Sequence, residues 1–493
     1  MSANADVRDL RRAVGVNLGG YLLKAAHPLL FILLVRAYGA EAFGVFKASE
    51  SILLVAARVA IFGLDKAMLW WVPRCPDGHR RTAGRSSFLL VTLSASLMGL
   101  LIATLLAPAL AQLIAVPEAE NSLRLMALAL VPMVWTDLRL HALMGARSMG
   151  PQVLVRETVV PLTMLLTGLA LHPLGGDLAL TMVVAHCVGA ALALTLYRRH
   201  LGADADDADD AADGMPLPPR KLMAYAWPMA AAEIANTVLL RMDIWAVAAL
   251  GDPRLIGIYG AVQQFGNTIR QVRRSFDPIV VAISSRLSLH PDPERLATGF
   301  SYATFLVLLT QLPLLVVLIE LAPELMGLYG EGFSAGADAV IVLSAFWVLN
   351  GATSLAGVVV TGFGASRLTL VNTLVTIALQ AALLALLVPR LQLLGAALAV
   401  GLAYSAQSSM QVLEMRHVTG AWNFRPMVSW PVVMAAPLAL MLFGWRAVVD
   451  TPSLAERLVA VGLFAIAYAG LAFGLHRRVS RTMATQSYPR VVV

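Results

Sequence analysis

The segment LLVRAYGAEAFGVFKASESILLVAARVAIFGL, Leu33 to Leu64, decides the fold because it places a charge deep inside an apolar run. That charge is Arg58, and the apolar run extends from Phe43 to Val72. A charged side chain near the centre of a bilayer costs about 2.5 kcal/mol or more unless it faces a partner or a water-filled cavity. Arg58 therefore marks a functional position in a membrane-spanning helix.

The same local layout recurs 212 positions later in the chain. Four residues of the first copy have an identical counterpart at this offset: Gly39, Arg58, Asp65 and Arg74 correspond to Gly251, Arg270, Asp277 and Arg286. An internal repeat that carries two intramembrane arginines predicts a two-lobed transporter.

The composition is that of a polytopic membrane protein. Hydrophobic residues make up 58% of the 493 residues, charged residues make up 14%, and the mean hydropathy is +0.74. A spanning helix needs about 20 mostly apolar residues, and about 14 stretches qualify. The longest polar segment runs only from Arg198 to Lys221, which leaves no room for a soluble catalytic domain. Cys75 and Cys187 have no metal-site or disulfide spacing, so we expect no metal and no cofactor.

The predicted fold is all-α, with about 14 transmembrane helices in two six-helix lobes and two additional C-terminal helices. The predicted spans are 13–38, 42–72, 86–107, 121–145, 151–171, 178–198, 222–250, 256–285, 299–321, 335–362, 367–388, 393–415, 427–448 and 456–475. The predicted domains are an N-terminal lobe (1–198), an acidic cytoplasmic linker (199–220), a C-terminal lobe (221–420) and two further helices with a basic cytoplasmic tail (421–493). Because the repeat offset covers six helices, an even number, both lobes should have the same orientation.

Basic residues predict the orientation in the membrane. Arg8, Arg11 and Arg12 precede the first apolar run, and further arginines cluster between the second and third. The positive-inside rule places both regions in the cytoplasm, and with an even helix count both termini are cytoplasmic. The N-terminal segment lacks the pattern of a removable signal peptide.

Two helices carry polar stripes that cannot face lipid. At 100° per residue, one narrow face of the second helix carries Lys47, Glu50, Arg58 and Asp65. The corresponding face of the eighth helix carries Gln263, Asn267, Arg270, Arg274 and Asp277. We expect these stripes to face each other across a cavity.

The cationic residues of these helices have two interpretations. In the first, an anionic substrate group such as a phosphate is bound by Lys24, Arg58, Arg270 and Arg274. Polar or gating positions of the same cavity would then be Glu50, Asp65, Asn267 and Asp277. In the second, the arginines are structural, and Arg58 pairs with Asp277 while Arg270 pairs with Asp65.

The fourth predicted helix contains a further polar group, Asp137, Arg139 and His141. These residues could form a proton relay. A local pair between Asp137 and His141, four residues apart, is an equally good interpretation.

The segment from Leu33 to Leu64 also resembles the start of polysaccharide repeat-unit flippases, a family of the multidrug/oligosaccharidyl-lipid/polysaccharide exporter superfamily. The resemblance consists of Arg36, Gly39, Phe43, Gly44 and Phe46. It implies two like-oriented lobes with 12 to 14 helices, which is the plan that the repeat predicts.

The related lipid II flippases carry cationic residues in helices one, two and eight, which line a central cavity for a lipid diphosphate. The positions that match by helix are Lys24, Arg58 and Arg270. The second copy has one additional residue before Gly257 and Tyr259, which shifts its register by one position.

The resemblance implies a flippase that moves undecaprenyl-diphosphate-linked oligosaccharide repeat units across the bacterial inner membrane by alternating access. These units would supply a surface polysaccharide such as exopolysaccharide, capsule or O-antigen. The expected partners are the lipid-linked glycan, membrane lipid and other polysaccharide assembly proteins, with no nucleic acid and no enzymatic activity. Alternatives are a cation-coupled multidrug exporter of the same superfamily and a membrane glycan polymerase or ligase. The arginines near mid-membrane disfavour the exporter, and the short outside loops disfavour the enzyme.

Overall fold

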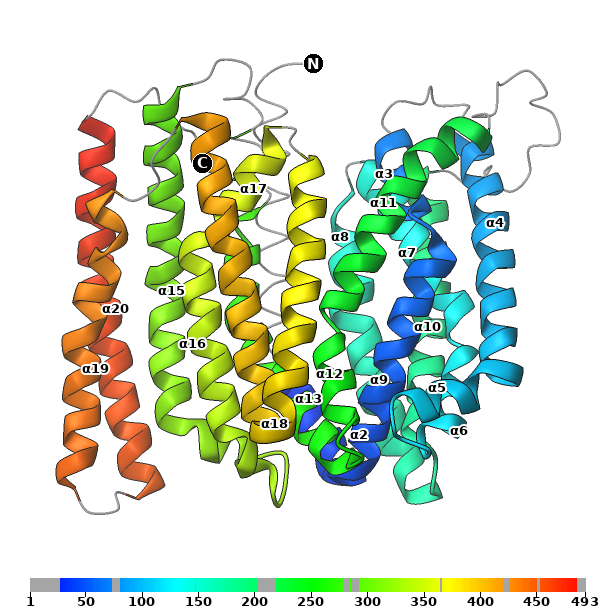
Figure 1. The fold of residues 1–493 in the computed structure, drawn as a ribbon, viewed down its shortest axis with the longest axis horizontal. Coiled ribbons are helices and arrows are strands. Elements are labelled where there is room, and N and C mark those ends of the chain that lie inside the picture. The colour runs from blue at the N-terminus through cyan, green and yellow to red at the C-terminus, as the bar shows by residue number, and fades with distance from the viewer. Residues whose placement is uncertain are drawn as a thin grey trace. The chain divides into compact units, whose positions relative to one another are not determined.

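In the computed structural model, all regular structure in the described residues is helical (Figure 1). The structure describes residues 27–72, 80–146, 148–201, 219–277, 280, 284, 292–363, 366–420, 425–449 and 453–485. The predicted all-α membrane fold is confirmed. The chain forms two compact units, Met1–Ala261 and Val262–Val493, which are described separately below. The predicted lobe boundaries remain a prediction, and most of the predicted linker lies outside the described residues.

The first unit consists of short and long helices joined by tight turns. Its elements are α2 (His27–Ile61), α3 (Leu64–Trp71), α4 (Arg80–Leu101), the π-helical turn η2 (Ile102–Leu106), α5 (Ala107–Leu113), α6 (Ala119–Ala127), α7 (Leu130–Gly145), α8 (Gly150–Gln152), the π-helical η3 (Val153–Val159), α9 (Val160–Leu171), the 3₁₀ turn η4 (His172–Leu174), α10 (Leu178–Leu201), α11 (Pro219–Leu239), α12 (Met242–Ala248) and the first part of α13 (Pro253–Arg274).

Two glycines that correspond in the repeat both adopt a positive φ. Gly39 interrupts α2 with a φ of 83°, and Gly251 has a φ of 74° immediately before α13. Positive φ is readily adopted only by glycine. The predicted turn between the first two spans therefore lies at Gly39, although helix flanks it closely on both sides.

The second predicted span, 42–72, is not one continuous helix. It breaks where Phe62 and Gly63 both adopt positive φ, 47° and 71°, and α3 begins at Leu64. A Cβ on Gly63 would lie 2.3 Å from the carbonyl oxygen of Ala226, so this turn also packs directly on α11. The turn redirects the chain between Arg58 and Asp65 instead of leaving both on one straight helix.

Two other glycines bring α2 and the start of α13 into direct backbone contact. A Cβ on Gly44 would lie 1.7 Å from the carbonyl oxygen of Pro253. A Cβ on Gly257 would lie 2.0 Å from the carbonyl oxygen of Ala40. Since any side chain would overlap the neighbouring backbone, this crossing requires glycine at both positions. Gly44 belongs to the flippase-like motif, and Gly257 is its register-shifted counterpart in the second copy.

The second unit contains the remaining helices. These are the rest of α13, α15 (Pro293–Gly327), the 3₁₀ turn η6 (Phe333–Gly336), α16 (Ala337–Thr353), α17 (Leu355–Gly362), α18 (Ser366–Thr419), the 3₁₀ turn η7 (Pro426–Val428), α19 (Trp430–Val448) and α20 (Leu454–Thr485). The predicted turn between spans 367–388 and 393–415 corresponds to a break inside α18, where Gln392 has a φ of 47°.

Local sequence explains where two of these helices begin. The Asp292 carboxylate accepts a hydrogen bond from the Arg295 backbone N–H, and Pro293 occupies the first turn of α15. At α20, Ser453 and Glu456 form a reciprocal capping box, in which each side chain accepts from the other residue's backbone N–H.

The two C-terminal helices α19 and α20 lie side by side and both pack on α15 (Figure 1). Their shared apolar core includes Val316, Leu321, Leu442, Phe464 and Tyr468. A buried charge cluster reinforces it, because Arg457 of α20 donates to Glu320 at 3.0 Å and also pairs with Glu324. Glu320 is fully buried, so its charge depends on this pairing.

Eight helical stretches in the described residues are long and apolar enough to cross a membrane, including the stretch Pro293–Gly327. Many of their outward positions are leucine, valine or phenylalanine, as expected for surfaces that contact lipid. Together with the other helices, these stretches agree with the predicted plan of about 14 spans.

Candidate functional site

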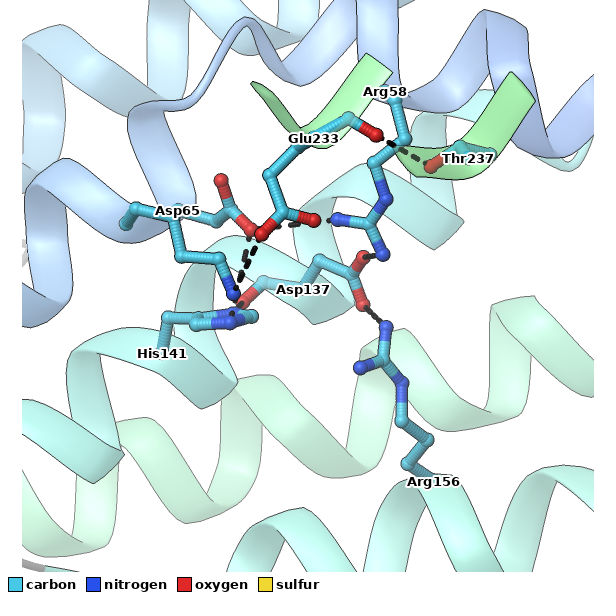
Figure 2. A network of polar contacts seen from close by, with 8 residues as sticks. Arg58, Asp65, Asp137, His141, Arg156, Glu233 and Thr237 are labelled. Atoms are coloured by element: carbon cyan, nitrogen blue, oxygen red, sulfur yellow. Dashed lines mark hydrogen bonds and ion pairs between the residues drawn. The ribbon is translucent and has the colours of Figure 1, made fainter. Parts of the chain in front are cut away.

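Arg58 lies in a cluster of charged residues within the first unit (Figure 2). Its guanidinium contacts the carboxylates of Asp65 and Asp137, each at 3.4 Å. Asp65 comes from the first turn of α3 and Asp137 from the middle of α7, so Arg58 joins three helices. Arg58 therefore lies among polar groups, and the side chains that it contacts are two carboxylates.

Asp137 is the centre of this cluster. Its second oxygen pairs with Arg156, which belongs to the π-helical segment η3. The Asp137 side chain is buried, so its charge is compensated by two guanidinium groups rather than by solvent. A buried carboxylate between two arginines is stable only while both partners remain in place.

His141 lies one helical turn after Asp137 on α7 and points toward Asp65 (Figure 2). Its Nδ1 is 2.7 Å from the backbone oxygen of Asp137, and its Nε2 is 3.7 Å from Asp65 Oδ2. Asp137 and His141 are therefore in contact, as the local-pair interpretation expects, but their two side chains do not pair with each other. The histidine bonds the backbone of Asp137, while the Asp137 carboxylate binds arginines.

A further ion pair extends the cluster to α11. Lys66 Nζ lies 3.5 Å from Glu233, whose backbone oxygen accepts from the Thr237 hydroxyl. With this pair included, three carboxylates are matched by three cations when His141 is neutral. The residues Arg58, Asp65, Lys66, Asp137, His141, Arg156 and Glu233 are called the Arg58 cluster below.

Arg270, the counterpart of Arg58 in the repeat, has different partners in the second unit. Its guanidinium carbon lies 4.6 Å from the centre of the Trp347 ring and 5.3 Å from that of Tyr404. No carboxylate of the described residues lies within ion-pair distance of it. Cation–π contacts attract a guanidinium without cancelling its charge. The two repeat-related arginines are therefore unlike in their electrostatic surroundings.

The other predicted positions of α13 lie close to Arg270 in sequence. Asp277 pairs with Arg273 at 2.8 Å, so the partner that the structural interpretation assigned to Arg58 is engaged within its own unit. Asn267 is exposed, and Arg274 is half-buried with no carboxylate of the described residues at ion-pair distance.

Glu50 forms a separate pair with Lys47 at 2.7 Å. The ammonium group of Lys47 also lies 5.3 to 5.7 Å from the ring centres of Phe31, Phe43 and Phe46. Lys24, the remaining predicted cationic residue, lies outside the described residues.

Sequence reasoning did not assign a site role to Arg156 or Lys66. Arg156 had a usable signal, since it follows Val153, Leu154 and Val155 within a predicted span. An intramembrane arginine is by default a functional position with a partner to be found. Its pairing with Asp137 depends on the packing of α7 against η3, which spacing alone does not define.

Comparison with known proteins identifies the family of this chain. The family described as "Polysaccharide biosynthesis protein" matches residues 10–276, more than half of the chain. The chain belongs to this family. The match includes the flippase-like motif, the Arg58 cluster and Arg270. No protein of curated function matches the chain at a significant level.

Solved structures of transporters share the fold of this family member. Lipid II flippase MurJ in an inward closed conformation is 11% identical over 94% of this chain and 98% of its own, with a TM-score of 0.75. An inward-facing multidrug resistance MATE family transporter of the MOP superfamily is 13% identical over 83% and 98%, with a TM-score of 0.67. A MOP superfamily transporter from Pyrococcus furiosus is 14% identical over 85% and 97%, with a TM-score of 0.58. At these identities the likeness establishes the fold, which is that of MOP-type membrane transporters.

Proposed function

We propose that this protein is a flippase for lipid-diphosphate-linked oligosaccharide repeat units. It would move complete units, carried on undecaprenyl diphosphate, from the inner to the outer leaflet of a bacterial inner membrane, with both termini in the cytoplasm. No bond is made or broken. The family supports a role in polysaccharide biosynthesis, and the fold supports transport by alternating access.

The observation that carries the proposal is the state of Arg270. A guanidinium in an intramembrane helix is costly to bury, by about 2.5 to 3.5 kcal/mol on insertion scales. Contacts with Trp347 and Tyr404 recover part of this, at about 0.5 to 2 kcal/mol. They leave the positive charge available to a ligand. A diphosphate is a suitable ligand because its oxygens accept the parallel hydrogen bonds that a guanidinium donates.

The neighbours of Arg270 favour an anion further. Arg273 and Arg274 follow within one helical turn, and Asp277 compensates only Arg273 at ion-pair distance. Lys24 completes the predicted cationic set, as the resemblance to lipid II flippases implies. Arg58, with its two carboxylates, would contribute to the cavity through its cluster rather than as a free cation.

A cation-coupled drug exporter is the alternative with the same fold, since MATE transporters are structural neighbours. Such a protein would need acidic groups open to a cationic substrate. In the Arg58 cluster Asp65, Asp137 and Glu233 are each paired with a cation, which favours an anionic substrate for this chain.

The test compares Arg270→Ala and Arg270→Lys in cells that lack the native chain. We expect Arg270→Ala to leave complete lipid-linked units in the inner leaflet, as measured by mass spectrometry with a membrane-impermeant labelling reagent. Arg270→Lys should restore part of the transport, because it keeps the charge but loses the parallel hydrogen bonds. Arg390→Ala is the matched control, since this exposed arginine of the same unit bonds a backbone oxygen of its own helix and pairs with no carboxylate of the described residues.

Native transport by Arg270→Ala at equal protein level would refute the assigned role. An unchanged glycan pool with increased drug sensitivity in cells without the chain would favour the exporter. Single units that reach the outer leaflet but are never lengthened would indicate a polymerase or ligase.

A further inference from the structure

His141 and Asp65 face each other with no hydrogen between them, so that one proton could bind there. The backbone oxygen of Asp137 can only accept a hydrogen bond, so His141 Nδ1, 2.7 Å away, must be the donor. In the neutral ring Nε2 is then the unprotonated nitrogen. It faces Asp65 Oδ2 at 3.7 Å. Two acceptors are directed at each other, and neither has a hydrogen to share.

Asp65 is also poorly satisfied for a buried carboxylate. Its relative exposure is 1%, and its Oδ1 has no hydrogen-bond partner among the described residues. From the same residues its Oδ2 receives one hydrogen bond, a long contact from Arg58 at 3.4 Å. Buried carboxylates normally accept several hydrogen bonds, so a missing donor at this position needs an explanation.

We propose that His141 and Asp65 form a proton-binding site that controls the pairing of Arg58. A proton on His141 Nε2 would convert the two facing acceptors into a donor and an acceptor. Because Arg58 and His141 approach the same oxygen, Oδ2, the protonated histidine competes with Arg58 for it. Protonation therefore weakens the contact between Arg58 and Asp65.

The charges around the site give this proton a larger effect. The charged groups around it are Arg58 of α2, Lys66 of α3, Asp137 of α7 and Arg156 of η3, with Glu233 of α11 paired to Lys66. Glu157 of η3 lies near Arg156, and His186 of α10 lies near Asp137. The Arg58 cluster itself holds three carboxylates and three cations while His141 is neutral, and protonation of His141 makes its net charge more positive by one unit. In a medium of low dielectric constant such a change of charge favours a change in conformation or the arrival of an anion.

This site goes beyond the proposed transport activity, because it identifies the proton as a coupling ion. If the protein binds a proton in the conformation open to one side of the membrane and releases it in the conformation open to the other side, a pH gradient would drive the movement of the lobes. A site that alternates between two pairings of one arginine is the kind of two-state element that such coupling requires.

His186 provides a matched control. Its Nδ1 makes the same backbone bond, at 2.8 Å to the oxygen of Met182 four residues earlier. No carboxylate of the described residues lies within ion-pair distance of its ring. His141→Gln and His186→Gln thus remove the same side chain with and without the facing acid.

The direct experiment is ¹⁵N solid-state NMR of histidine-labelled protein in liposomes, between about pH 5 and 8, where histidine ordinarily titrates. The signal absent from His141→Gln identifies His141. We expect a proton on Nδ1 alone at high pH and on both nitrogens at low pH. In Asp65→Asn, His141 should stay neutral throughout this range. A His141 that carries its proton on Nε2 at high pH, that never becomes doubly protonated, or that titrates unchanged in Asp65→Asn would overturn the proposal.

A transport measurement tests the coupling separately. Proteoliposomes would receive lipid-linked units extracted from cells that lack this chain, with and without an imposed pH gradient. The gradient should accelerate transport by the native protein and His186→Gln but not by His141→Gln. If His141→Gln responds to the gradient as the native protein does, the coupling role is wrong. A flippase inactive under every condition would refute the proposed function, while the NMR result would still decide the proton site.

Discussion

Replacing Asp137 by asparagine removes the one carboxylate that compensates both Arg58 and Arg156. At 3.4 Å and an effective dielectric constant of about 20, the attraction between Asp137 and Arg58 alone is about 5 kcal/mol. Relief of the cost of burying the Asp137 charge cancels part of this. Removing one partner of a buried ion pair typically costs about 3 to 5 kcal/mol, and the retained asparagine oxygen favours the lower value. We expect Asp137→Asn to destabilise the protein by about 3 kcal/mol.

Thermal inactivation of the purified protein in detergent is the suitable assay, because large membrane proteins commonly unfold irreversibly and their stability is then a rate. A loss of about 3 kcal/mol corresponds to at most about a 100-fold shorter half-life of the folded protein at a fixed temperature. Asp338→Asn is the control, since Asp338 is exposed at the start of α16 and forms no ion pair with any described residue.

The double variant Asp137→Asn with Arg156→Gln separates a specific pair from a general loss of charge. Arg156→Gln removes the arginine whose ion pair Asp137→Asn breaks, while Arg58 keeps its contact with Asp65. The double variant should therefore be more stable than the sum of the single effects predicts, by about 1 to 3 kcal/mol. Strict additivity, or an Asp137→Asn variant as stable as the native protein, would refute the reasoning on the Arg58 cluster.

Two further substitutions test the packing. Gly257→Ala should lower the thermal stability in the same assay, because its methyl group would lie 2.0 Å from the Ala40 carbonyl oxygen. Gly462→Ala, with open space around it, should have no such effect. Equal stability of the two variants would contradict the described crossing of α2 and α13. Arg457→Met should destabilise by about 3 kcal/mol, because it leaves Glu320 buried with only the distant contact to Arg446 at 3.6 Å. Adding Glu320→Gln to Arg457→Met should restore most of that loss, and a double variant no more stable than Arg457→Met would show that the pair does not anchor α20.

Much of the fold could be predicted from the sequence because membrane helices are defined by length and hydropathy. The repeat also identified two positions where the backbone requires glycine, since Gly39 and Gly251 both adopt positive φ. The break at Phe62 and Gly63 was not predicted, because a single glycine inside an apolar run is as typical of close helix packing as of a turn.

The candidate site was predicted only in part. Intramembrane arginines can be recognised in a sequence by their cost, which is why Arg58 and Arg270 were found. Most of their partners cannot be recognised in this way, since Asp137 reaches Arg58, and Trp347 and Tyr404 reach Arg270, through tertiary packing. The electrostatic difference between the two arginines therefore appears only in the folded protein, although the repeat makes them equivalent in sequence.

The leaflet location of lipid-linked glycans in cells without this chain tests the central claim most directly. Mass spectrometry would identify the glycans, and an impermeant reagent would label those exposed in the outer leaflet. The proposed flippase predicts complete lipid-diphosphate-linked repeat units that accumulate in the inner leaflet and are protected from the reagent. Complete units that reach the outer leaflet as readily as in cells with the chain would contradict it.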